Sequence, residues 1–162
     1  MKSWISWRGH RWLGFPARLY LGWVFLIACV HKILHPGSFA VDVATYQFLP
    51  LSTVNLFALT VPWMELGAGA LLVLGIRVRA AALVVSGLMV SFMIALAWAL
   101  HLGLDMSCGC FASQAAAEND PISWHTLGRD AGWLLLGLYV LFFDHHPIGL
   151  ETLKRRQDRC VT

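Results

Sequence analysis

The sequence predicts an all-α integral membrane protein, a four-helix bundle with both termini in the cytoplasm. Three observations support this fold class. Hydrophobic residues make up 58% of the 162 residues and charged residues only 13%, about half the charged fraction of a typical soluble domain. Four apolar stretches approach the roughly 20 residues that a bilayer core requires. No stretch shows the alternating pattern of barrel strands, so helices are the expected spanning form.

The composition also excludes two other classes of protein. A net charge of +3, scattered along the chain, is too weak for a nucleic-acid-binding surface. So much apolar surface cannot stay unfolded in water, which excludes a disordered chain. We therefore expect a lipid bilayer around the chain and no nucleic-acid partner.

We expect one membrane domain over residues 18–143, with spans at approximately residues 18–34, 54–74, 80–102 and 127–143. The third span is the clearest, because it carries no formal charge. The second carries one acid, Glu65, and the first has Lys32 at its far end. The fourth is apolar only after Asp130, over about 20 Å of helix. It therefore has to include the Arg129–Asp130 pair to cross the bilayer.

The basic residues predict the orientation. Ten of the twelve Lys and Arg residues precede or open the first span, join the second to the third, or follow the fourth: Lys2, Arg8, Arg11, Arg18, Arg77, Arg79, Lys154, Arg155, Arg156 and Arg159. Under the positive-inside rule these segments are cytoplasmic. The connections around residues 35–53 and 103–126 then face outward. We expect a multi-pass protein of a bacterial inner membrane.

The two ends of the chain are expected to lie outside the bundle. Residues 1–17 interleave cations with tryptophans, which predicts an amphipathic segment at the cytoplasmic membrane surface. Residues 144–162 form a basic cytoplasmic tail. Residues 26–29 (Leu-Ile-Ala-Cys) also resemble a lipoprotein cleavage box. Because the apolar helix continues past this box to Ile33, we expect the segment to remain as a span.

Two cysteines in the second outward connection indicate redox chemistry. Cys108 and Cys110 flank Gly109 on the side of the membrane where thiols are oxidised. A disulfide between residues two apart closes a tight ring, which the glycine helps to form. Ring strain makes a disulfide easier to reduce, and this favours a redox-active pair over a structural one.

Other roles for the cysteines stay open. Cys29 could form a structural disulfide with the outward connection, or the pair could bind zinc or copper with His101 or His125. Cys29 also lies one helical turn before Lys32, and an adjacent ammonium favours a thiolate. It is therefore either a third redox sulfur or a small apolar core residue. Cys160, in the basic tail, is expected to have no role.

Charged groups inside the spans indicate a polar cluster. Glu65 falls near the middle of the second span, where an unpaired carboxylate costs several kcal/mol. It must be protonated or face a partner, and the candidates are Lys32, Arg129, His31 and His35. Three residues earlier, Pro62 removes a backbone donor and bends the helix. The Arg129–Asp130 pair either joins this cluster or forms a purely structural network.

Five groups of residues resemble a known family: His31-Lys32-Ile33-Leu34 with Pro36; Tyr46 with Leu49-Pro50; Pro62-Trp63-Met64-Glu65-Leu66 with Gly69; Cys108-Gly109-Cys110-Phe111; and Arg129-Asp130. From about Arg18 to Phe143, the sequence resembles the methylamine-utilisation protein MauE family, within the DoxX-like group of four-helix membrane proteins. The Cys-Gly-Cys-Phe block is the most specific element. Ala112 stands where family members often have glycine, a departure that affects only the local turn.

The resemblance implies a periplasmic thioredoxin-like partner and, in the namesake pathway, the maturation of methylamine dehydrogenase. We hypothesise a thiol–disulfide oxidoreductase in which Cys108 and Cys110 exchange electrons with the partner and Cys29 resolves the mixed disulfide. Lys32 and Arg129 stabilise thiolate charge, and a quinone or another membrane carrier takes the electrons. Two alternatives stay open. One is a non-catalytic membrane assembly factor, and the other is a small-solute or metal permease, which needs an oligomer to form a pore.

Overall fold

The computed structural model describes residues 10–47, 49–103 and 124–144. These residues form five α-helices: α2 (His10–Leu34), α3 (Pro36–Thr45), α4 (Leu51–Leu74), α5 (Val78–His101) and α6 (Trp124–Phe143). All but α3 are long and apolar enough to cross a membrane. The structure therefore confirms the all-helical class and the four candidate spans.

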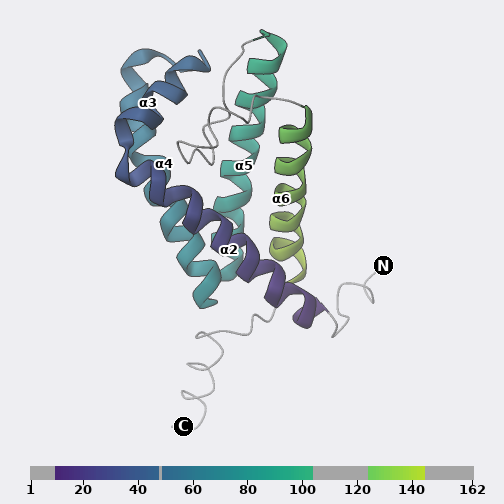
Figure 1. The fold of residues 1–162 in the computed structure, drawn as a ribbon. Helices are drawn as coiled ribbons and strands as arrows, with labels where there is room; N and C mark the ends of the chain where they lie inside the picture. Colours follow the sequence, from purple (N-terminus) through teal and green to yellow (C-terminus); the bar gives the residue numbers. More distant parts are fainter. Residues whose placement is uncertain (1–9, 48, 104–123, 145–162) are drawn as a thin grey trace.

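The four long helices form an antiparallel bundle (Figure 1). α2 packs most extensively on α4 and α5 packs on α6, while α4–α5 and α2–α6 contacts close the ring. At one end lie α3, the end of α5 and the start of α6 (Figure 1); we call this the α3 end. At the opposite end lie the start of α2, the turn between α4 and α5, and the end of α6.

The helices differ from the expected spans mainly at their starts. α2 begins at His10, within the segment expected to lie on the membrane surface, and it continues through Pro16. Arg18, expected near the start of the first span, is buried instead, with Nη1 3.6 Å from Asp144 Oδ2. Because Asp144 supplies the opposite charge, Arg18 can be buried in the bundle and α2 extends beyond it toward the N-terminus.

α3 lies within the connection that was predicted to face outward and for which no helix was predicted. Pro36 occupies its first turn, where the missing N–H costs nothing because that group has no partner inside a helix. Phe39 and Val43, one turn apart, pack against Val54 and Ala58 of α4. This small apolar cluster holds α3 against α4.

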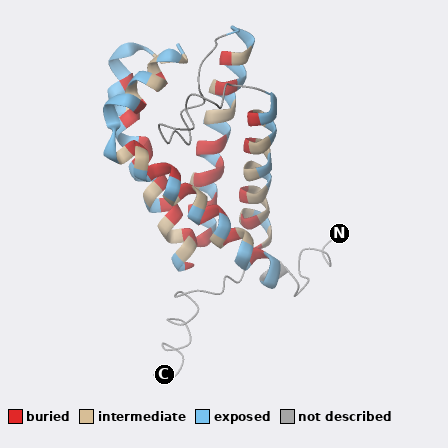
Figure 2. Cartoon of the chain, viewed as in Figure 1, coloured by how far each residue is buried: buried red, intermediate tan, exposed pale blue. Residues whose placement is uncertain are grey.

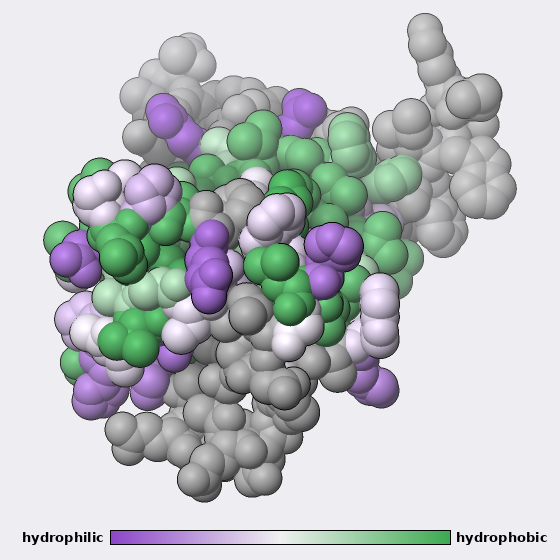
Figure 3. Space-filling model, turned by 90° about the horizontal axis from the view of Figure 1, so that it is seen from above, coloured by the Kyte–Doolittle hydropathy of each residue, from purple (hydrophilic) through white to green (hydrophobic). Residues whose placement is uncertain are grey.

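Apolar residues fill the bundle and also cover its sides. Buried positions lie on the faces that the helices turn to one another (Figure 2). The larger apolar cluster among the described residues includes Leu21, Phe25, Val61, Leu72, Val85 and Val140. Large apolar side chains such as Trp23, Leu59 and Leu135 remain exposed, as expected for helices surrounded by lipid. Seen from the α3 end, polar residues are scattered among apolar ones (Figure 3).

α2 and α4 lie close together at two glycines, Gly22 and Gly69. A Cβ atom built on Gly22 lies 3.0 Å from the carbonyl oxygen of Gly69, and one built on Gly69 lies 3.1 Å from that of Gly22. Both distances are shorter than most contacts that real Cβ atoms make, so a side chain at either position requires the facing helix to shift. This crossing sets the separation of the two helices that carry the site below.

Candidate functional site

A buried ion pair joins α2 to α4. Lys32 Nζ donates hydrogen bonds to Glu65 Oε1 at 2.7 Å and to Oε2 at 3.0 Å. The two side chains are only 3% and 2% exposed. Each group offsets part of the desolvation cost of burying the other as a charge in an apolar interior. We call this pair the Lys32–Glu65 site.

Helix direction explains how these two side chains meet. In an α-helix each Cα–Cβ bond leans toward the N-terminus of the helix. Lys32 lies near the end of α2 and therefore leans toward the middle of the bundle. Glu65 lies in the antiparallel α4 and leans toward the α3 end. The long lysine side chain covers the remaining distance.

Two aromatic rings complete the surroundings of the ammonium. Lys32 Nζ lies 5.1 Å from the centre of the Phe39 ring and 5.0 Å from that of Phe92. Phe39 comes from α3 and Phe92 from α5. The site is thus the place where α2, α3, α4 and α5 meet. Neither ring was among the predicted site residues, and Phe39 fell in a segment without a predicted helix.

Of the four predicted partners of Glu65, Lys32 is the residue that pairs with it. The rings of His31 and His35 contact each other, with their centres 5.1 Å apart. His31 also acts on α3: burial raises the pKa of the Asp42 carboxyl, and the nearby His31 opposes that shift. The two histidines therefore belong to the junction of α2 with α3.

Cys29 is fully buried in α2. Its side chain is 0% exposed, and Sγ donates a hydrogen bond to the carbonyl oxygen of Leu26 at 3.1 Å. The prediction that Lys32 favours a Cys29 thiolate took account of the ammonium but not of its counter-ion. In the structure the Glu65 carboxylate offsets that positive charge, so Lys32 favours a Cys29 thiolate less than expected.

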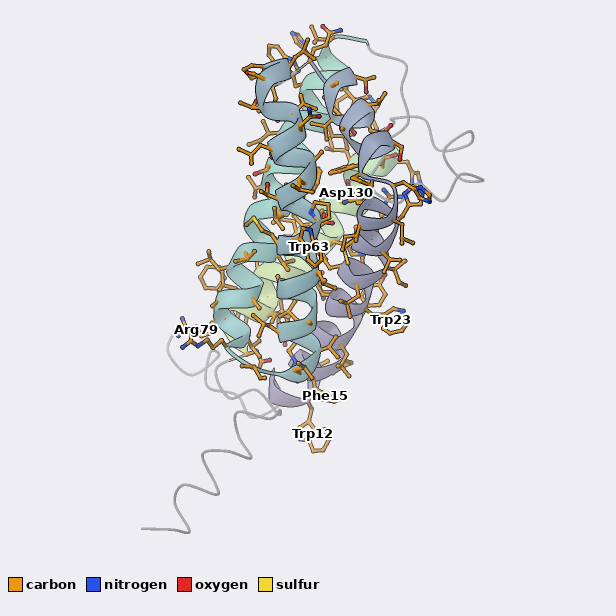
Figure 4. The ribbon with its side chains drawn as sticks, turned by 90° about the vertical axis from the view of Figure 1, so that its left-hand side faces the viewer. Trp12, Phe15, Trp23, Trp63, Arg79 and Asp130 are labelled. Carbon is orange, nitrogen blue, oxygen red and sulfur yellow. The ribbon has the colours of Figure 1, made fainter. Side chains whose placement is uncertain are left out.

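Arg129 and Asp130 lie in α6, beside the same interior. Arg129 Nε donates to Asp130 Oδ1 at 3.2 Å, and Asp130 is the buried member of the pair. Figure 4 shows Asp130 within the bundle, in the half nearer the α3 end. The guanidinium of Arg129 also lies over the Trp133 ring, 5.0 Å from its centre.

A small hollow separates this pair from the Lys32–Glu65 site. Its lining residues come from all four long helices: Phe25, Ala28, Lys32, Glu65, Met89, Phe92, Asp130 and Trp133. Its cavity volume of about 20 Å³ is enough for roughly one water molecule. Three of the predicted supporting residues, Lys32, Glu65 and Asp130, therefore share one interior space.

The other predicted redox residues, Cys108 and Cys110, lie outside the described residues, as does Cys160. Within the ranges that the structure describes, no three His, Cys, Asp or Glu side chains are grouped to hold a metal ion.

Comparison with known proteins gives one family. The family model described as methylamine utilisation protein MauE matches residues 10–143. Methylamine utilization protein MauE of Methylorubrum extorquens is 34% identical over 119 residues, 73% of this chain and 62% of that protein. The protein of the same name from Methylophilus methylotrophus is 38% identical over 96 residues, 58% of this chain and 50% of its own length. The chain thus spans 50% to 62% of the length of these relatives. No solved structure matches it.

Proposed function

The chain belongs to the methylamine utilisation protein MauE family, and from this we propose a membrane thiol–disulfide redox protein as its function. It exchanges electrons with a periplasmic thioredoxin-like partner and so supports disulfide formation in a periplasmic enzyme. Both curated relatives are named for methylamine utilisation, so we propose methylamine dehydrogenase as that enzyme.

One structural observation supports the proposal most. The described ends of α5 and α6 lie at the α3 end of the bundle (Figure 1), and the chain between them contains Cys108 and Cys110. Cys29 and the Lys32–Glu65 site lie toward the same end, since α2 ends there at Leu34. The connection that carries the cysteine pair thus begins and ends at the end of the bundle where α2 has Cys29 and Lys32.

The proposed chemistry balances in two steps. The reduced partner's thiolate attacks the Cys108–Cys110 disulfide and forms a mixed disulfide, which the partner's second thiolate resolves. This step replaces the resolving role first hypothesised for Cys29, because the Cys29 side chain is fully buried. The partner leaves oxidised, and Cys108 and Cys110 are left as thiols. A membrane quinone then takes two electrons and two protons from these thiols, which restores the disulfide and yields the quinol.

The described residues have supporting roles in this scheme. Arg129 supplies positive charge near the start of α6, and Lys32 does so at the end of α2, where Glu65 balances it. Asp130 holds the Arg129 guanidinium through its hydrogen bond. The hollow beside these groups is water-sized and smaller than a quinone ring, so we place the quinone at the lipid-facing surface of the bundle.

Trapping of the mixed disulfide tests the redox function. Cys108→Ser and Cys110→Ser each leave one reactive thiol, which attacks the disulfide of an oxidised partner in the reverse of the proposed exchange. Because the second cysteine is missing and cannot release the partner, one of these variants should accumulate a covalent complex with a thioredoxin-fold protein. The complex is measured on non-reducing gels and its partner is identified by mass spectrometry. Cys110→Ser should also abolish redox cycling of the partner. Cys160→Ser is the matched control and should behave as wild type. Normal cycling in Cys110→Ser would contradict the mechanism.

A second candidate is a non-catalytic membrane assembly factor. The complete burial of Cys29 and the closed Lys32–Glu65 pair favour it, because both suit a rigid scaffold. An assembly factor should still mature its enzyme when Cys108 and Cys110 are both changed to serine. A redox protein should lose that activity in the same double variant.

A further inference from the structure

The contacts around Lys32 describe more than a salt bridge. We propose that Glu65, Phe39 and Phe92 form a binding site for a primary alkylammonium ion, and that the chain's own Lys32 fills it. Lys32, Glu65, Phe39 and Phe92 form this site by themselves. It does not depend on the cysteines, so it stands or falls separately from the redox function.

The hydrogen bonds identify the class of ligand. A primary ammonium, whose nitrogen carries one carbon, has three N–H donors, and Lys32 directs two of them to the two oxygens of Glu65, at 2.7 and 3.0 Å. A quaternary ammonium has no N–H and cannot make these bonds. The carboxylate therefore selects for an ammonium with at least two N–H donors, and a primary ammonium, like that of Lys32, supplies both the charge and the donors.

The aromatic rings define the remaining sides. Both ring centres lie within 5.1 Å of Nζ, inside the distance at which a cation is attracted to the face of a ring. The attraction is larger in a dry interior, and the ammonium is 3% exposed. A guanidinium is planar and wider than an ammonium, so it fits this space poorly.

The structure also provides room for a separate ligand once Lys32 is shortened. Lys32→Ala removes the side chain beyond Cβ, three carbons and the nitrogen, which are the heavy atoms of n-propylammonium. The space they leave joins the existing hollow, which Lys32, Glu65 and Phe92 already line. The vacated site thus has the chemistry and the volume for n-propylammonium, and the adjoining hollow supplies the extra length that a non-bonded contact with Cβ needs in place of the C–C bond.

Thermal unfolding of the full-length protein in mild detergent tests this site. The probe is n-propylammonium chloride, and tetramethylammonium chloride at the same concentration controls for salt. In Lys32→Ala, n-propylammonium should raise the unfolding temperature by about 3–6 °C at roughly ten times its Kd. Tetramethylammonium should give no such rise. Wild type, whose site is filled, and Lys32→Ala/Glu65→Ala, which lacks the carboxylate, should not respond to either ion.

The outcomes separate clearly. An equal response of Lys32→Ala to both ions, or an equal response of all three proteins to n-propylammonium, overturns the proposal. Lys32→Ala leaves a lone buried carboxylate and can fail to fold, so it is also extracted with the amine present throughout. Recovery only with n-propylammonium supports the site. Failure at every amine concentration, while the double variant is recovered without amine, overturns it.

Discussion

Lys32 and Glu65 can remain charged inside a membrane bundle because each is the counter-ion of the other. Their two hydrogen bonds and the two flanking rings replace the water that both groups lose. Removing one member leaves an uncompensated charge in an apolar interior, whereas removing both leaves only a loss of packing.

A double-mutant cycle measures this coupling. Lys32→Met and Glu65→Leu should each lower the free energy of unfolding by about 3–5 kcal/mol, and the double variant should lose less than either single variant. Denaturant unfolding in detergent provides the values. Thr60→Ala, an exposed position on α4 whose hydroxyl bonds only within its own helix, should change the value by less than about 0.5 kcal/mol. Additive effects of the two single changes would show that the pair is not coupled.

The sequence predicted that Glu65 needs a partner, because a lone carboxylate at that depth is costly. It could not choose Lys32 among four candidates, since Lys32 lies at a helix end and Glu65 near the middle of its span. The opposite lean of side chains on antiparallel helices resolves that difference in depth. Phe39 could not be predicted at all, because its position depends on how α3 folds back onto α4.

At the scale of the elements, the contact between α2 and α4 depends on the absence of two side chains. Gly22 and Gly69 let the backbones touch, an arrangement that is common where membrane helices pack without a hydrophobic driving force. Gly67, two residues before Gly69 on the same helix, has open space where its side chain would lie. The two positions on α4 therefore form a matched pair.

Substitution of these glycines tests the helix crossing. Gly69→Leu should lower the free energy of unfolding by about 1–3 kcal/mol, because its side chain forces α2 and α4 apart. It should also lengthen the Lys32–Glu65 contact. Gly67→Leu should be neutral or slightly stabilising, since it adds helix propensity without a clash. Similar losses in both variants, measured by the same denaturant unfolding, would mean that the crossing is not the close contact.

α3 shows the limit of reading elements from hydropathy. Its ten residues are too few to span a bilayer, and Pro36 with Gly37 is typical of a turn. The helix forms because Phe39 and Val43 are buried on α4, a tertiary contact that no local pattern encodes. The four spans were predictable because length and hydropathy are sufficient to identify them.

At the scale of the whole molecule, α2 takes part in two buried ion pairs among the residues that the structure describes. Lys32 joins it to Glu65 of α4, and Arg18 joins it to Asp144, directly after α6, near the opposite end. Each pair is almost completely buried, and an apolar core lies between them. α2 is thus joined to its neighbours by an ion pair near each end, which restrains its position in the bundle.

The number of spans and their antiparallel order follow from the sequence. The fold does not determine which end of the bundle faces the cytoplasm. The bundle brings the start of α2 and the end of α6 to one end (Figure 4), where Arg79 also lies. The cytoplasmic location of that end stays a prediction, based on the distribution of basic residues. Likeness to the wider DoxX-like group likewise stays a prediction.

The central claim is that Cys108 and Cys110 form an exchangeable disulfide on the outer side of the membrane. Labelling of intact cells with a membrane-impermeant maleimide tests it most directly, in a Cys29→Ala/Cys160→Ser background that keeps only this pair. We predict no labelling at rest and full labelling after an impermeant phosphine reductant. Labelling that requires cell lysis, or thiols that never respond to reductant, would contradict the account.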